Sequence, residues 1–381
     1  MIIHSRIKDY RLEVVEDIWS SKFLSFPNAS VGNPDKAVAG PPIKTFGGDN
    51  VGIGSQINRP FYLIDSNVLK LYGPQLRRLI SDDFVLAIDA DERNKEYMKV
   101  ADYYRALIEA GFTRNDTLVT FGGGILQDIS GFIASTLYRG TKWVYVPTTL
   151  LAQADSCIGS KTSVNFGPAK NLIGTFYPPD VICSDLSFTR TLSPADFNSG
   201  LGEIIKFHLL SDANGYALLR RYLDSGDLRG PLFRDIILST LSIKRSYFEG
   251  DEFDTGRRNL LNYGHCYGHA LESASDFAIA HGEAVMVGMG FANDVSLKRG
   301  ILSKQRHAEI EALLRRFYPK FDLGGISAGR VIEYLKRDKK RTGAGLTMVL
   351  ARDIGQCEKF DDVNEDEVRA AHEGFARRYG R

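Results

Sequence analysis

The stretch TLVTFGGGILQD at residues 117–128 joins a short apolar run to three consecutive glycines. Its β-forming residues 117–121 predict a buried strand, and the apolar residues that follow predict a helix beginning around Leu126. Backbone amides at the start of such a helix can face a pyrophosphate. The spacing is GGG rather than GxGxxG, so a tight turn without a ligand fits as well. The segment predicts a strand–turn–helix unit and leaves anion binding open.

Apolar runs alternate with helical patterns on both sides of this unit. Their order is PFYLIDSNV, a helix from Tyr72, FVLAID, a helix over Met98 to Ala110, and, after the glycine turn, WVYVPTT. This alternation predicts a parallel sheet with crossover helices, which is a Rossmann-like α/β domain. The Gly-, Pro-, Asn- and Ser-rich segment 26–59 predicts a long loop or irregular hairpin.

The pattern changes to helical periodicity from about Thr189 onward, as in GLGEIIKFHLL and HAEIEALLRRF. A chain of 381 residues exceeds the size of a single hydrophobic core. We therefore predict two domains, an α/β domain over 1–186 and a mainly α-helical domain over 187–381.

Composition and charge exclude several classes of protein. The formal net charge of +1 argues against nucleic-acid binding, which needs a broad excess of Lys and Arg. No stretch approaches the roughly 20 apolar residues of a membrane span, and the N-terminus lacks the apolar core of an export signal. The four cysteines form no CxxC pair, which indicates neither a zinc knuckle nor a disulfide framework. These features predict a cytoplasmic protein whose anionic ligands are small.

Three of the seven histidines lie within 17 residues, in NYGHCYGHALE and HGEAV. His265 and His269 are four residues apart, so a helix would place them on one face, and His281 follows. Neutral imidazoles are favoured zinc ligands, although a pair of histidines is more often a satisfied part of a core. The absence of HExxH disfavours a metalloprotease. The spacing leaves metal binding by one or more of these histidines open.

Glu203 and Lys206 lie three residues apart in GLGEIIK, on one face of a predicted apolar helix. A surface ion pair is the simpler interpretation. The alternative is a carboxylate that completes a His/Glu metal set with one position open for a substrate oxygen.

Other polar residues carry a structural and a functional interpretation each. Asp65 can cap a turn or accept hydrogen bonds from a ribose, and Asp128 can interact with a helix dipole. Lys and Arg side chains recur in Gly- and Asn-rich contexts. Each can be solvated, or together they can bind a substrate bearing phosphate and carboxylate. They are Arg139, Lys161, Lys170, Lys244, Arg258, Lys339 and Lys340.

Eight blocks carry a family resemblance: GGGILQDISGF, YRG, VPTTLLAQADSCIGSKTSVN, KNLIGTFYPP, TLSPADFNSGLGEIIK, NYGHCYGHALE, HGEAV and DKKRTG. In this order and spacing, from about Asp65 to Gly355, the chain resembles dehydroquinate synthase and its sugar-phosphate cyclase relatives. The resemblance implies an NAD-binding α/β half, a helical metal-binding half and a homodimer.

The resemblance also implies the residues of the site. Glu203, His265 and His281 would hold a zinc or cobalt ion. NAD contacts would be Asp65, Asn67, Glu92, Lys95, Gly123, Gly124, Ile125, Asp128, Thr148, Thr149, Asp155, Lys170, Phe188 and Thr191. Substrate contacts would be Lys161, Asn171, Lys206, Lys244, Arg258, Asn262, His269 and one of Lys339 or Lys340, with Arg139 reaching from the partner subunit to the phosphate.

The reaction implied by the resemblance is ring-alcohol oxidation, phosphate elimination, reduction, ring opening and aldol closure, which leaves NAD unchanged. The relatives act on a seven-carbon keto acid phosphate, sedoheptulose 7-phosphate or glucose 6-phosphate. Lys244 and Arg258 would bind a carboxylate, which favours the keto acid. Ser160, Cys266 and the NFG at 165–167 depart from the usual synthase pattern and keep a secondary-metabolism cyclase as an alternative. A glycerol-dehydrogenase-like oxidoreductase, which would release NADH, is the alternative from another class.

Overall fold

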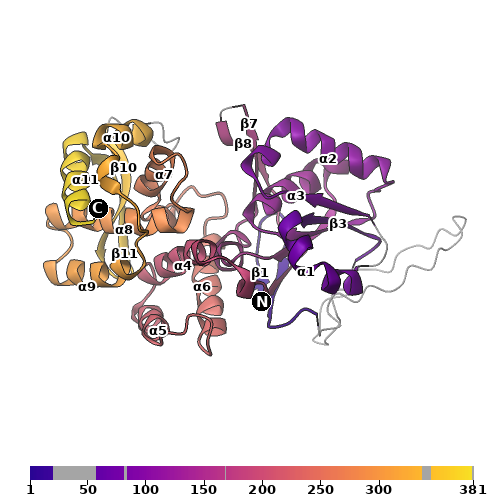
Figure 1. The fold of residues 1–381 in the computed structure, drawn as a ribbon, viewed down its shortest axis with the longest axis horizontal. Coiled ribbons are helices and arrows are strands. Elements are labelled where there is room, and N and C mark those ends of the chain that lie inside the picture. The colour runs from indigo at the N-terminus through magenta and orange to yellow at the C-terminus, as the bar shows by residue number, and fades with distance from the viewer. Residues whose placement is uncertain (20–56, 81–83, 168, 337–344, 380–381) are drawn as a thin grey trace, which may run out of the picture. The chain divides into compact units, whose positions relative to one another are not determined.

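The computed structural model describes residues 1–19, 57–80, 84–167, 169–336 and 345–379. Lys339, Lys340 and residues 26–56 of the predicted loop 26–59 lie outside the described residues. The chain divides into two compact units, Met1–Thr148 with Ser160–Ser187, and Thr149–Gly159 with Phe188–Arg381. Each unit is drawn in Figure 1.

The described part of the first unit contains a seven-stranded sheet, parallel except at β1. Its spatial order is β1-β2-β9-β6-β5-β3-β4. The strands are β1 (Ile2–Ile3), β2 (Tyr10–Val15), β3 (Pro60–Asp65), β4 (Val85–Ile88), β5 (Thr117–Gly122), β6 (Lys142–Pro147) and β9 (Val181–Asp185). The predicted parallel α/β sheet is confirmed, and β3 and β5 are buried at every residue, as strands covered on both faces require.

Three α-helices accompany the sheet in the described part of this unit: α1 (Ser66–Leu79), α2 (Tyr97–Glu109) and α3 (Gly124–Thr136). The prediction that the first helix starts at Tyr72 is wrong by six residues. Asp65 ends β3 and caps α1 directly, because its carboxylate accepts a hydrogen bond from the Asn67 amide at 2.8 Å.

The strand order reverses around β3. From β3 the chain moves outward to β4, then returns to the other side of β3 as β5. Ile64 pairs with Phe121, so Asp65 and the glycine turn lie at neighbouring carboxyl ends. In open α/β sheets ligands bind at such a switch point.

A two-stranded antiparallel hairpin, β7 (Lys161–Phe166) and β8 (Ala169–Phe176), was not predicted. It packs against α3, where a Cβ on Gly131 would lie 2.6 Å from Thr162 Cγ2. The hairpin presents Lys161, Lys170 and Asn171 from the first unit.

The second unit is mainly helical, as predicted, and also contains an unpredicted hairpin of β10 (Leu346–Asp353) and β11 (Gln356–Val363). Its helices are α4 (Pro194–Leu209), α5 (Ala213–Asp224), α6 (Phe233–Phe248), α7 (His265–Ala274), α8 (His281–Lys298), α9 (Lys304–Leu314), α10 (Ala328–Lys336) and α11 (Glu365–Tyr379). Helix α8 is the core helix, buried continuously from Ala284 to Ser296 and packed by α4, α7, α9, α11 and β10 (Figure 1). No described helix is long and apolar enough to cross a membrane.

Candidate metal centre and cofactor site

Three histidines converge where α7 and α8 begin. His265, the first residue of α7, and His269, one turn later, face His281, the first residue of α8. Each can offer one ring nitrogen so that all three atoms lie within 4.8 Å of one another. The ring centroids are 5.2 to 5.4 Å apart. The structure therefore brings together the histidines that the sequence singled out.

Glu203 on α4 reaches the same place. Its Oε1 lies 3.4 Å from His265 Nε2 and 3.5 Å from His281 Nε2. Neither side-chain oxygen of Glu203 makes a well-formed hydrogen bond among the described residues, although Lys206 Nζ is in ion-pair contact with Oε2. Glu203 and Lys206 are 0% and 2% exposed, so the surface ion-pair interpretation is wrong.

Two sets of ligands are geometrically available for a divalent ion. One consists of the three histidines, and the other replaces His269, which is exposed, with the buried Glu203. A buried carboxylate without well-formed hydrogen bonds is costly unless a cation compensates it. Carboxylate and imidazole donors suit zinc and related ions, so the residues present fit such an ion.

The pKa values of the cluster show how its charges are coupled. Burial favours the neutral form of Glu203, but Lys206 and His281 outweigh it and lower the pKa to about 2. Burial opposes a charge on His281 too, yet the nearby carboxylates of Glu203 and Glu272 raise its pKa to about 10. The pKa of His265 is lowered well below its usual value by burial, Lys206 and the other two histidines. The carboxylates of Glu203 and Glu272 thus favour the charged form of His281, and a metal ion at this ring would compete with the proton.

Glycines allow the three helices to approach closely enough to form the cluster. A Cβ on Gly202 would lie 2.3 Å from the Gly282 carbonyl oxygen, and one on Gly282 would lie 1.8 Å from the Ser199 carbonyl oxygen. Gly264 has φ of +79° and packs against α8, where its added Cβ would lie 2.6 Å from the Val285 carbonyl oxygen. Glu203, His281 and His265 each directly neighbour one of these glycines. Their significance was missed in the sequence, where nothing distinguishes a close-approach glycine from any other.

Lys244 and Arg258 meet beside Gly159, also within the second unit. A Cβ added to Gly159 would lie 2.6 Å from Arg258 Nη2 and 4.0 Å from Lys244 Nζ. Lys244 donates to the backbone and side chain of Asp155, and Arg258 donates to the carbonyls of Glu252 and Gly159. Both cations are 5% exposed. Burial lowers the pKa of Lys244, Asp155 opposes this and Arg258 adds to it. These are buried cations, not the solvated surface groups of the alternative interpretation.

In the first unit the glycine turn is built as predicted. Helix α3 starts at Gly124 with Gly123 as its cap, and no side chain caps it. The Thr148 amide donates to the Gly122 carbonyl at 3.0 Å, while the Thr148 hydroxyl is buried without a hydrogen-bond partner among the described residues. An uncapped helix N-terminus with an orphaned hydroxyl beside it fits a pyrophosphate. The carboxylate of Asp65 already caps α1, and burial raises its pKa against the opposing amides of Asn67 and Val68.

A buried lysine links other predicted residues of this unit. Lys95 Nζ donates to Asp128 at 2.5 Å and to Asn171 Oδ1 at 2.6 Å. Glu92 accepts from Asn165 Nδ2 at 2.7 Å. The contacts that Lys95 and Asp128 make in this structure are thus with each other and with the hairpin.

The remaining predicted residues are placed without being brought into one group. Exposed side chains are those of Asn67, Arg139, Lys161, Lys170, Asn171 and Thr191. Arg139 and Asn171 have φ of +63° and +53°, a strained conformation that often marks functional positions. Ile125 lies in the first turn of α3. Phe188 is buried, and its carbonyl accepts from the Thr191 hydroxyl at 3.3 Å. Thr149 accepts from the Ala152 amide, and Asn262 donates to the Asn259 carbonyl.

Comparison with known proteins agrees with this geometry. The family profile described as 3-dehydroquinate synthase N-terminal matches residues 85–199, and 3-dehydroquinate synthase C-terminal matches 200–341. A 3-dehydroquinate synthase from Clostridium acetobutylicum is 35% identical over 300 residues, covering 77% of this chain and 84% of the relative.

Two solved structures share the fold. 2-Epi-5-epi-valiolone synthase from Streptomyces hygroscopicus, with NAD+ and Zn2+ bound, superposes with a TM-score of 0.80 at 26% identity and 97% coverage of both chains. A 2-deoxy-scyllo-inosose synthase complexed with carbaglucose-6-phosphate, NAD+ and Co2+ has a TM-score of 0.79 at 20% identity, covering 98% of this chain and 99% of that one. With both profiles matched in order and a relative at this identity, the chain belongs to the 3-dehydroquinate synthase family.

Proposed function

We propose that this chain is an NAD- and divalent-metal-dependent sugar-phosphate cyclase that forms a carbocycle from a keto-acid sugar phosphate, as a 3-dehydroquinate synthase does. The observation that carries the substrate class is the pair Lys244 and Arg258, buried together beside Gly159. Two buried cations suit a carboxylate, which can form ion pairs with them, whereas an uncharged hydroxymethyl group cannot compensate their charge.

The proposed metal ligands are Glu203, His265 and His281, with zinc or cobalt as the ion. Bound there, the metal would polarise a substrate oxygen, and NAD would accept and return a hydride. Glu203 supplies a carboxylate, and Nε2 of each histidine lies within 3.5 Å of its Oε1. His269 is left exposed to contact substrate or phosphate.

The second unit supplies charge and orientation to the substrate. Lys206 is held rigidly by Glu203 and lies 4.6 Å from the Phe207 ring centroid, so its ammonium can donate to a substrate oxygen without a large entropy cost. Lys244 and Arg258 would orient the carboxylate end, and Asn262 would donate to a ring hydroxyl. Lys339 or Lys340 remains a further proposed contact.

The first unit, with the α/β domain assigned to 1–186, is proposed to bind NAD. The pyrophosphate would lie on the α3 N-terminus at Gly123, Gly124 and Ile125, and the buried Thr148 hydroxyl would gain a partner. The other cofactor contacts proposed in the first unit are Asp65, Asn67, Glu92, Lys95, Asp128 and Lys170, and those proposed in the second unit are Thr149, Asp155, Phe188 and Thr191. Lys161 and Asn171 are proposed to contact substrate.

A second candidate is a valiolone-type cyclase acting on sedoheptulose 7-phosphate. The likeness to 2-epi-5-epi-valiolone synthase over 97% of both chains favours it. The two candidates differ in the group that faces Lys244 and Arg258.

The test is phosphate release by the purified protein with NAD and each of three sugar phosphates. We expect the seven-carbon keto acid phosphate to be turned over best, with phosphate release exceeding added NAD manyfold. Preferred turnover of sedoheptulose 7-phosphate would establish the second candidate. Stoichiometric accumulation of NADH would instead indicate a simple dehydrogenase.

The Arg258→Ala variant tests the substrate assignment at one residue. One charge-assisted hydrogen bond contributes roughly 1.5 to 3 kcal/mol, so kcat/KM for the keto acid phosphate should fall at least about tenfold. Arg257→Ala is the matched control, because Arg257 is exposed and stacks at 4.3 Å on the Tyr247 ring. Equal effects of both variants would contradict a carboxylate contact by Arg258.

The assembly and location are also proposals. We propose a homodimer in which Arg139 reaches the phosphate of the partner's site. A cytoplasmic location is supported by the four cysteines, none of which forms a disulfide bond in the structure.

A further inference from the structure

Glu272 approaches the proposed metal centre from its outer side. It lies seven residues after His265 and three after His269, so all three occupy one face of α7. Its Oε2 is 3.2 Å from Nδ1 of His281, the ring nitrogen that does not face Glu203. The side chain is only 14% exposed, so solvent screens this contact weakly.

The two proposed histidine ligands share one hydrogen-bond pattern. His265 Nδ1 lies 3.3 Å from the Tyr263 carbonyl oxygen, which can only accept, so Nδ1 carries the hydrogen there. His281 Nδ1 faces a carboxylate in the same way. When either ring is neutral, Nε2 is then the nitrogen with a free lone pair, and in both rings Nε2 lies within 3.5 Å of Glu203 Oε1.

The charges of the cluster give Glu272 a second role. Lys206 already pairs with Glu203, so Glu203 alone would not neutralise the two positive charges that a divalent ion adds. A nearby carboxylate compensates half of this charge and makes the imidazole a better donor.

We propose that Glu272 is the positioning residue of the metal centre, which fixes the tautomer and ring orientation of His281 so that Nε2 is presented to the ion. This inference rests on the proposed metal site and adds a residue that does not itself touch metal or substrate. Outer carboxylates of this type typically alter metal affinity by roughly 10- to 100-fold.

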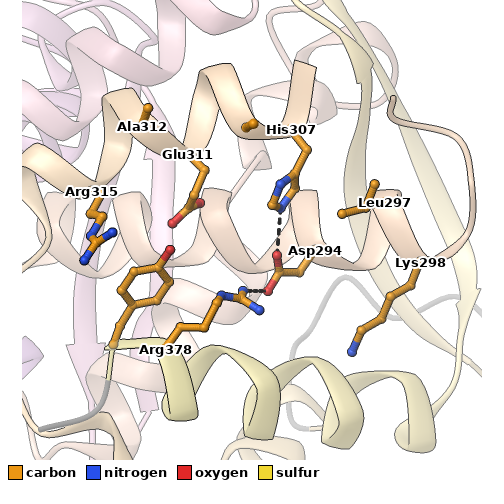
Figure 2. A pocket seen from close by; sticks show the side chains of 10 residues that line it. Asp294, Leu297, Lys298, His307, Glu311, Ala312, Arg315 and Arg378 are labelled. Carbon is orange, nitrogen blue, oxygen red and sulfur yellow. Dashed lines mark hydrogen bonds and ion pairs between the residues drawn. The ribbon is translucent and has the colours of Figure 1, made fainter. Parts of the chain in front are cut away.

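The chain offers a matched control in the same unit. Asp294 on α8 accepts from His307 Nε2 at 2.8 Å and also pairs with Arg378 on α11, as Figure 2 shows. Asp294 and His307 thus form a histidine–carboxylate pair like that of Glu272 and His281, and the Asp294 side chain is 5% exposed. Neither Asp294 nor His307 is a proposed metal ligand. Asp294→Asn should lower the stability of the protein while leaving metal affinity unchanged.

The experiment measures Zn2+ affinity of the full-length metal-free protein by competition with a chromogenic chelator, and the absorption spectrum of the Co2+ form. Glu272→Ala should weaken Zn2+ binding by about 10- to 100-fold and change the Co2+ bands. Glu272→Gln should lose less, because its amide oxygen can still accept from Nδ1. The melting temperatures of the metal-free variants show whether either one fails to fold.

The outcomes separate this inference from the proposed function. If the unmodified protein binds no stoichiometric Zn2+, the proposed metal centre is wrong. If it binds Zn2+ and both Glu272 variants bind equally well, the positioning role is wrong. The positioning role is also wrong if the Glu272 variants lose Zn2+ affinity only in proportion to their loss of melting temperature and Asp294→Asn shows the same loss.

Discussion

Replacing Gly282 by alanine should disrupt the metal centre without changing a ligand. Gly282 directly follows His281 at the start of α8, and its amide donates to the Ser199 hydroxyl of α4 at 3.1 Å. An added Cβ would lie 1.8 Å from the Ser199 carbonyl oxygen. Because this obstacle is backbone, no side-chain rotation can relieve it.

The size of the effect follows from the distances. Real Cβ contacts below 3.0 Å are essentially absent, so α4 and α8 must separate locally by about 1.2 Å. Metal–ligand distances tolerate only about 0.2 Å. Glu203 lies on α4 and His281 on α8, so their separation should cost at least the roughly 10- to 100-fold in affinity seen for altered outer partners. Overpacking should also cost about 1 to 3 kcal/mol of folding stability.

The assay is Zn2+ competition with a chelator, together with thermal unfolding of the metal-free protein. Gly329→Ala is the control, since its nearest neighbour would be Ser327 Oγ at 4.0 Å. That substitution in α10 should be neutral or stabilising by up to about 1 kcal/mol. Wild-type Zn2+ affinity and wild-type stability in Gly282→Ala would refute the argument that close helix approach places the ligands.

Three further predictions concern stability and assembly. Burial lowers the pKa of His208 to about 4, with the Ile204 carbonyl opposing, so this group binds its proton more readily when unfolded. The contribution of neutral His208 to the free energy of unfolding is complete above pH 6.5 and is lost as the pH falls toward 4, a loss of about 3 kcal/mol. Urea titrations at several pH values measure this loss, and His208→Asn should flatten the pH dependence. Lys95→Met removes the ion-pair partner of the Asp128 carboxylate and should measurably lower the melting temperature of the NAD-free protein. An unchanged melting temperature would show that the ion pair does not contribute to stability. Mixing inactive Arg139→Ala with inactive Lys206→Ala should restore a fraction of the activity if the sites are shared between subunits, and no recovery despite proven subunit exchange would place Arg139 outside the partner's site.

Much of the first unit was predictable because its signals are local. Runs such as TLVTF and WVYVP consist mainly of β-branched, aliphatic and aromatic residues and are buried at every position, as in strands covered on both faces. The start of α1 was missed because Asp65 serves at once as the last strand residue and the helix cap. The hairpins β7–β8 and β10–β11 were missed because their strands mix polar and apolar residues, although Gly167-Pro168 and Gly355 are turn signals in the sequence.

The chemistry of the site was predictable as a list of residues but not as a geometry. The spacing of His265 and His269 places them on one face of a helix, and that relation is present in the sequence, whereas Glu272 was not singled out. The sequence does not say that Glu203 is fully buried or that Lys244 and Arg258 meet beside Gly159. Burial of an ion pair depends on what packs against it, which is a property of elements distant in the chain.

By itself, then, the sequence determined the parallel α/β unit, the glycine turn, the helical second unit and the residue types from which a metal centre can be built. The tertiary structure alone decided which of them meet, because α4, α7 and α8 can place Glu203, His265 and His281 together only where Gly202, Gly264 and Gly282 let the backbones touch. Local patterns record how a segment folds, since that depends on near neighbours. The close approach of two helices depends on the absence of side-chain atoms at positions far apart in the chain. The distances between the metal ligands that result from this approach are therefore known only from the three-dimensional structure.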